Sequence, residues 1–164
     1  MGEDSEQSKD QETTRALKLF VVLSRAAAAV GEHARHDILR HNLSVSEFGV
    51  LELLWHKGPQ PLGEVAERIL LTTGSVTYVI DQLVKQGLVA RRACPTDRRV
   101  IFAELTDAGR ERIAAIFPAH ANQIKRAVAG LSAEKQALAI DLLRSLGLSA
   151  RESLRGELAD EPTS

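Results

Sequence analysis

A chain of 164 residues with 44% hydrophobic, 26% charged and only 4% aromatic residues suits one globular, mainly helical domain rather than a β-sandwich. It has no apolar run near the ~20 residues of a membrane span, no secretory signal in its acidic start and a single cysteine, so we expect a cytoplasmic protein without disulfides or a membrane partner. The net charge of −1 is unevenly distributed, because residues 1–12 carry five acids and one lysine while residues 68–99 carry six bases and two acids.

The first part of the chain predicts a long helix. Residues 1–11 are acidic and polar without an apolar period, which is typical of a disordered tail. From residue 12 the apolar side chains recur at helical spacing, and the alanines at 26–29 suit close packing of helices. Residues 12–42 are therefore the predicted N-terminal helical segment, and Asn42 is expected to end it.

Two short helices begin the middle segment, residues 43–109. Ser44 and Glu47 have the spacing of a capping box at the start of the first helix. The glycine–proline pair at 58–59 is typical of a helix end. The second helix is predicted to open at Pro61, because proline is favoured at the first helical position.

A third helix and a hairpin complete this segment. Thr72 or Thr73 caps the helix. The runs 88–92 and 100–105 predict two short strands, and the Cys-Pro-Thr-Asp sequence between them supplies a turn. Three helices followed by a hairpin are the pattern of a winged helix-turn-helix, which places one helix in the major groove of DNA.

The remainder of the chain predicts further helices. Thr106 caps a long one, which Pro118 should kink or divide. We assign residues 110–155 to C-terminal dimerisation helices and residues 156–164 to a frayed tail. Apolar stripes on the first and last helices exceed what one small core can cover, and pairing two chains would hide them. The alternative is a monomer whose helices fold back on one another.

The third helix and the hairpin carry the predicted DNA contacts. Apolar residues cluster on one side of the helix, whereas hydroxyls, an amide, a phenol and an ammonium cover the other, and these groups bond to base edges and phosphates. Arginines on the hairpin can enter the adjacent minor groove. The predicted DNA-binding residues are Thr72, Thr73, Ser75, Thr77, Tyr78, Gln82, Lys85, Arg91, Arg92, Arg98 and Arg99. Asp97 would repel phosphate, so we expect it to pair with an arginine such as Arg99 and to brace the wing.

These motifs resemble the multiple-antibiotic-resistance regulator (MarR) family of bacterial transcription factors. The matching stretches are residues 62–66, 75–77, 80–83 and 87–89, and above all the sequence D-x-R-x5-L-T-x-x-G that runs from Asp97 to Gly109. The resemblance implies a mainly α winged helix-turn-helix with a small β-hairpin wing, in a homodimer with intertwined first and last helices. It also implies a repressor that leaves a pseudo-palindromic operator when a phenolic or quinone-like molecule, an oxidant or a metal binds.

Three kinds of signal stay open. A small aromatic effector would bind where the dimer helices meet the DNA-binding lobe, and its predicted lining residues are Phe20, His36, Phe48, Leu51 and Trp55. For the last three, core packing is the favoured alternative.

Cys94 lies next to arginines, which favour a reactive thiolate, and an incidental surface thiol is the alternative. His33 and His36 lie on the same side of a helix, which is a spacing that metal sites use. The sequence has no group of His and Cys residues with the close spacing of a metal site, so we predict neither a metal site nor a cofactor.

The sequence disfavours two other function classes. The sequence has no nucleophile elbow, P-loop, dinucleotide-binding glycine pattern or H-E-x-x-H, so we do not expect an enzyme. A winged helix that binds proteins instead of DNA would carry an apolar or acidic outward side on the third helix, whereas this side is polar with basic flanks. The expected partners are double-stranded DNA, a second copy of the chain and a small aromatic effector.

Overall fold

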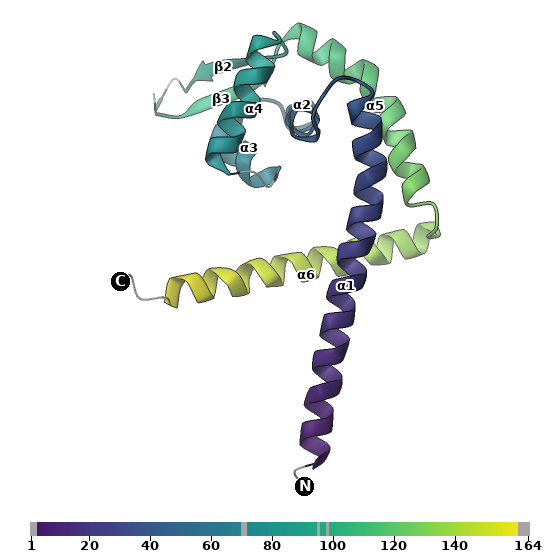
Figure 1. The fold of residues 1–164 in the computed structure, drawn as a ribbon. Coiled ribbons are helices and arrows are strands. Elements are labelled where there is room, and N and C mark those ends of the chain that lie inside the picture. Colours follow the sequence, from purple (N-terminus) through teal and green to yellow (C-terminus); the bar gives the residue numbers. More distant parts are fainter. Residues whose placement is uncertain (1–2, 70–71, 95, 98, 161–164) are drawn as a thin grey trace. The chain divides into compact units, whose positions relative to one another are not determined.

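The computed structural model describes residues 3–69, 72–94, 96–97 and 99–160. Its elements are the helices α1 (Glu3–Leu39), α2 (Val45–Lys57), α3 (Leu62–Arg68), α4 (Thr73–Lys85), α5 (Asp107–Ala127) and α6 (Ala133–Asp160) and the strands β1 (Gln60–Pro61), β2 (Val89–Ala93) and β3 (Ile101–Leu105). Figure 1 labels all of them except β1. The chain forms two compact units, of which the first ends at Ile124 and the second begins at Lys125. In the described part of the chain, no helix has the length and hydropathy of a membrane span.

The predicted fold class is confirmed, with one added strand. The sheet is antiparallel in the order β1-β3-β2, and β2 pairs with β3 in a register that sets Val89 opposite Leu105. The sequence analysis missed β1, whose two residues pair with Ala103 and Phe102. Pro61 is tolerated because β1 lies at the edge of the sheet, where a strand needs fewer N–H donors. We call β2, β3 and the turn between them the wing.

The hydrophobic core lies where α2, α3, α4 and the sheet meet. Within α4, the buried residues Val76, Ile80 and Leu83 recur at helical spacing. Other fully buried large side chains are Val50, Leu51, Leu54, Val65, Val89 and Ile113. The core therefore holds α4 by its apolar side and leaves the opposite side open.

Two helices extend beyond their predicted bounds. Helix α1 begins at Glu3, so the segment expected to be disordered is helical from that residue. Helix α6 continues to Asp160, where a frayed tail from residue 156 was expected, and residues 161–164 lie outside the described chain. Glutamate, glutamine and lysine are good helix formers, so a polar segment can lengthen a helix without an apolar side. Helix α5 continues through Pro118, so the division expected there does not occur.

Capping groups fix the ends of α2 and α4. Ser44 Oγ accepts a hydrogen bond from Glu47 N at 3.2 Å, and Glu47 Oε2 accepts one from Ser44 N at 2.8 Å, which confirms the capping box. Gly58 ends α2 with a φ of 71°, in the left-handed region that favours glycine. Thr72 Oγ1 accepts from Ser75 N at 3.2 Å, which selects Thr72 from the two expected caps of α4.

A close backbone contact joins α5 to the turn between α4 and β2. Thr106 N donates to Leu88 O at 3.1 Å, and the Thr106 hydroxyl donates to Gly87 O at 2.6 Å. Gly109 N in turn donates to that hydroxyl at 3.0 Å. A Cβ added at Gly109 would lie only 2.0 Å from Leu88 O, a distance that real structures do not show. The L-T-x-x-G sequence therefore holds the start of α5 against the end of α4.

Candidate nucleic-acid interface

Helix α4 lies next to the wing (Figure 1). Its side away from the core is polar and open to solvent. Tyr78 exposes 66% of its surface, and Gln82 is half-buried. Ser75, Thr77 and Lys85 are exposed as well. Neither Tyr78 nor Gln82 is buried in the core, so the helix can offer a phenol, an amide, hydroxyls and an ammonium to a bound partner.

The N-terminus of α4 is organised by its cap. Thr72 Oγ1 lies 2.8 Å from Ser75 Oγ, in addition to its bond from Ser75 N, so the two hydroxyls contact each other at the start of the helix. Thr73 is the first residue of α4, and its side chain lies outside the described structure, as does the whole of Arg98. The roles expected for those two side chains remain predictions from the sequence.

Arg91 is directed at α4. Its Nη1 lies 2.6 Å from Asp81 Oδ1, and its Nη2 donates to Thr77 O at 3.4 Å. The side chains of Arg91 and Asp81 are 35% and 44% exposed, so the pair lies at the surface. Asp81 shares the outward side of α4, and the sequence analysis did not pair it with the wing. Their proximity depends on how β2 packs against α4, which spacing along the chain does not reveal.

Arg92, the next residue of β2, has other partners. Its Nε donates to Glu104 Oε2 at 3.0 Å, and its guanidinium carbon lies 5.6 Å from the centre of the Phe102 ring. Ala90 lies opposite Glu104 in the β2–β3 register, so Arg92 is the diagonal neighbour of Glu104 on one side of the sheet. A correct register would have predicted this pair from the sequence. Arg92 therefore braces the wing, and Glu104 offsets its charge.

The predicted contact between Asp97 and Arg99 is present. Asp97 Oδ1 accepts from Arg99 N at 3.0 Å and from Arg99 Nε at 3.3 Å. The Arg99 side chain is nevertheless 92% exposed. Lys85, in the last turn of α4, is also exposed. Arg99 and Lys85 are therefore open to a phosphate group in a way that Arg91 and Arg92 are not.

A further side chain links α4 to α2. Glu47 Oε1 accepts from Gln86 Nε2 at 2.7 Å, while Glu47 Oε2 caps α2. One carboxylate thus joins the start of α2 to the end of α4, across 39 positions of sequence. The cap was predictable from the spacing of Ser44 and Glu47, whereas the second partner, Gln86, was not.

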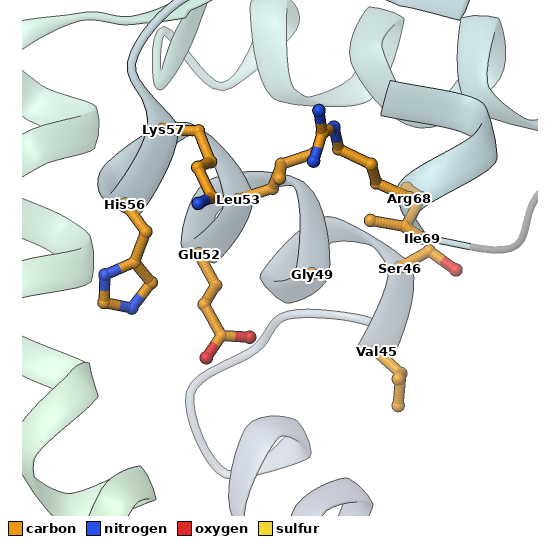
Figure 2. A pocket seen from close by; sticks show the side chains of 9 residues that line it. All are labelled: Val45, Ser46, Gly49, Glu52, Leu53, His56, Lys57, Arg68 and Ile69. Carbon is orange, nitrogen blue, oxygen red and sulfur yellow. The ribbon is translucent and has the colours of Figure 1, made fainter. Parts of the chain in front are cut away.

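A cavity of about 430 Å³ lies beside α2 and the end of α3 (Figure 2). Its lining residues are Val45, Ser46, Gly49, Glu52, Leu53, His56, Lys57, Arg68 and Ile69. The lining combines apolar side chains with two basic residues, one histidine and one carboxylate. Arg68 Nη2 lies 3.3 Å from Glu64 Oε2, and the His56 ring meets Phe117 edge-on with 5.1 Å between ring centres.

The residues predicted to line an effector pocket do not line this cavity. Phe48 and Leu51 are buried in the core, in agreement with the packing alternative. Trp55 is 38% exposed, so core packing is wrong for this residue. Phe20 and His36 are exposed on α1. The sequence did not identify the cavity, because it forms only where the outer side of α2 lies beside the end of α3.

Two polar contacts join α1 to α5. His120 Nδ1 lies 3.2 Å from Asp37 Oδ2, both residues are buried, and the Phe48 ring packs on the imidazole with 4.4 Å between ring centres. His33 Nδ1 lies 3.1 Å from Gln123 Nε2. Within the described residues, no group of three or more His, Cys, Asp or Glu side chains could hold a metal ion, so the zinc alternative has no candidate ligand set there.

Cys94 lies partly exposed at the end of β2. Its Sγ is 3.2 Å from Thr96 Oγ1. The Thr96 hydroxyl lowers the pKa of the thiol, and the backbone N–H groups of Thr96 and Asp97 lower it further. The sequence analysis expected a lowered pKa from neighbouring arginines, whereas hydrogen bonds are the cause.

Comparisons with known proteins agree with this architecture. Residues 43–101 match the model of the MarR family. The HTH-type transcriptional regulator MhqR of Bacillus subtilis is 45% identical over 140 residues, which cover 85% of this chain and 97% of the relative. Sco3205, a MarR family regulator from Streptomyces coelicolor solved in complex with DNA, has a TM-score of 0.74 at 25% identity, over 82% of this chain and 86% of that one. BpsR of Bordetella bronchiseptica, whose DNA binding is regulated by 6-hydroxynicotinic acid, has a TM-score of 0.71 at 27% identity, over 79% and 98%.

Proposed function

Because this chain belongs to the MarR family of transcriptional regulators, we propose that it is a homodimeric repressor whose helix α4 enters the major groove of operator DNA. The observation that carries the proposal is the outward side of α4, which the core holds away from the protein interior beside a basic wing. The likeness to Sco3205, which was solved with DNA, supports it.

The exposed groups divide into two kinds of contact. Tyr78 and Gln82 carry a phenol and an amide, which bond to base edges and so discriminate sequence. Lys85 and Arg99 carry exposed cations, which bind phosphates of any sequence. The N-terminus of α4 adds backbone N–H groups and the positive end of the helix dipole, which also favour phosphate.

The terminal helices support the homodimer. Large apolar side chains lie exposed on α1 and α6, among them Leu17, Leu19, Phe20, Val22, Leu138, Ile140, Leu142, Leu143, Leu148 and Leu154. Apolar surface of this extent is unfavourable in water, and a second copy of the chain would cover it. Two copies would also present two α4 helices to a pseudo-palindromic site.

The cavity of Figure 2 is our candidate for the effector site. Val45, Leu53 and Ile69 can pack against an aromatic ring, and Lys57 and Arg68 can bind a phenolate or carboxylate. A ligand there would contact both α2 and α3, the helix that directly precedes α4, and so could displace α4. The regulation of BpsR by 6-hydroxynicotinic acid, a hydroxylated aromatic acid, supports this chemistry.

DNA binding is tested by fluorescence anisotropy with a labelled duplex from the promoter region of the chain's own gene and an unrelated duplex of equal length. We expect affinity for both to fall as salt rises, because phosphate contacts release counterions. Gln82→Ala should change the ratio of the two affinities, whereas Lys85→Ala should weaken both equally. If the wild-type protein binds neither duplex at low salt, the proposal is wrong.

The homodimer and the effector site have separate tests. Sedimentation velocity should show a dimer for the wild type and for Lys135→Glu, at the polar start of α6, and a monomer for Leu142→Glu. A monomeric wild type would contradict the dimer. A phenol, quinone or aromatic acid that binds the folded protein should raise its melting temperature and release DNA, and Arg68→Ala should weaken both effects. Retention of both effects in Arg68→Ala would exclude this cavity.

A further inference from the structure

We propose that Asp81 and Arg91 are a positioning pair, which fixes the wing against α4, so that Arg91 acts on DNA binding through α4 rather than through a phosphate. The inference rests on the proposed function, and it changes the role that the sequence gave to Arg91. The pair sets the angle between α4 and the wing, and under the proposed function both of these elements contact the same DNA.

The contact spans one turn of α4. Arg91 Nη1 lies 2.6 Å from Asp81 Oδ1, and Nη2 donates to Thr77 O at 3.4 Å. Thr77 and Asp81 are four residues apart, so they lie on the same side of the helix. A planar guanidinium held through two of its nitrogens has a defined orientation, which a single ammonium group cannot reproduce. The pair therefore fixes both the distance and the orientation of β2 relative to α4.

The pair is a second attachment between these elements. Backbone bonds join them at the turn, where Leu88 N donates to Leu83 O and Gly87 N donates to Val84 O, both at 2.9 Å. Arg91 lies three residues beyond Leu88, about 10 Å further along an extended chain. The buried residues Val89 and Ala103 hold the sheet in the core, and the pair adds a polar attachment on the outward side of α4, further along β2 than the turn.

The charge of Asp81 gives the pair a second effect. Asp81 lies between Tyr78 and Lys85 on the outward side of α4, where an unpaired carboxylate would repel phosphate. The guanidinium of Arg91 neutralises it. The competing role for Arg91 is a direct phosphate contact, with Asp81 only an acidic neighbour. The two roles predict opposite results for conservative substitutions.

Anisotropy titrations of the full chain with the promoter duplex, over a series of salt concentrations, distinguish the roles. For a positioning pair, Arg91→Lys keeps the charge but loses the two-nitrogen contact, so it should weaken binding by about two- to fivefold. Its slope of log Kd against log salt should stay that of the wild type, whereas Arg91→Ala, which also leaves Asp81 unpaired, should weaken binding at least as much. Asp81→Asn should also weaken binding, and adding Arg91→Ala to it should have no further effect, because the pair is already broken.

The competing role gives the opposite results. Arg91→Lys would then bind like the wild type, and Asp81→Asn would tighten binding. Either of these results overturns the proposal. Lys85→Ala, which removes an exposed cation of the same helix, is the matched control and should lower the slope by about 0.9. Thermal melts check that each variant is folded, and if Arg91→Ala does not fold, Arg91→Lys and Asp81→Asn decide. A wild type that binds no duplex at low salt would show instead that the proposed function is wrong, and the inference with it.

Discussion

The contact at Gly109 offers a direct test of how α5 is joined to the DNA-binding elements. In Gly109→Ala the new Cβ would lie 2.0 Å from Leu88 O and 2.9 Å from the Leu88 carbonyl carbon. Both atoms belong to the backbone of the turn after α4, so no side chain can rotate away. The start of α5 would have to separate from the turn, and with it the bond from Thr106 N to Leu88 O.

Three terms set the size of the effect. Forcing a methyl group into a packed site costs about 1–3 kcal/mol, and a 2.0 Å approach to backbone places this case at the upper end. Weakening the bond between Thr106 N and Leu88 O adds about 0.5–1.5 kcal/mol. Alanine is favoured over glycine inside a helix by about 1 kcal/mol, which offsets part of the loss. We therefore expect Gly109→Ala to lower the free energy of unfolding by about 2–3 kcal/mol.

Urea unfolding followed by circular dichroism, at one fixed protein concentration, measures this change. Gly63→Ala is the matched control, because Gly63 also lies in a helix and an added Cβ there meets nothing within 4 Å. That variant should be as stable as the wild type or more stable by up to about 1 kcal/mol. If Gly109→Ala behaved like Gly63→Ala, the close approach of α5 to the turn would not exist in solution.

Two further substitutions test other parts of the structure. Asp37→Asn alters the buried contact with His120 and should lower the free energy of unfolding by about 1–3 kcal/mol. The control Glu32→Gln, which removes the charge of an exposed pair with Arg35, should leave the urea unfolding curve unchanged. If Asp37→Asn gave the same curve as Glu32→Gln, the buried contact would not contribute measurably to stability. Thr96→Val should raise the pKa of Cys94, because the hydroxyl that favours the thiolate is lost, and so move the pH profile of iodoacetamide alkylation to higher pH. Thr96→Ser should retain the wild-type profile, and an unchanged profile in Thr96→Val would exclude the hydroxyl as the cause.

Features that depend on residues close in sequence were predictable. The capping box joins Ser44 and Glu47, which are three positions apart in the sequence. The contact of Asp97 with Arg99 joins residues that are two positions apart. The helical period of the apolar residues likewise predicted which side of α4 faces the core. These features required no knowledge of how the elements pack.

Features that depend on packing were not predictable. Strand β1 has two residues, and it exists because Gln60 pairs with Ala103, more than forty positions away. The bond between Glu47 and Gln86 likewise joins two helices across the core. The cavity of Figure 2 draws its lining from the outer side of α2 and the end of α3, so it exists only once these elements pack.

The alternation of side chains along β2 explains what the wing arginines do. Arg91 and Arg92 are neighbours in a strand, so they project to opposite sides of the sheet. Arg91 meets Asp81, and Arg92 meets Glu104, so each neutralises an acid of the protein. The bases counted in residues 68–99 therefore overstate the charge that the wing can offer to DNA. Under the proposed function, attraction to DNA then depends on exposed cations such as Lys85 and Arg99, the latter 92% exposed despite its bond to Asp97, although the whole chain carries a net charge of −1.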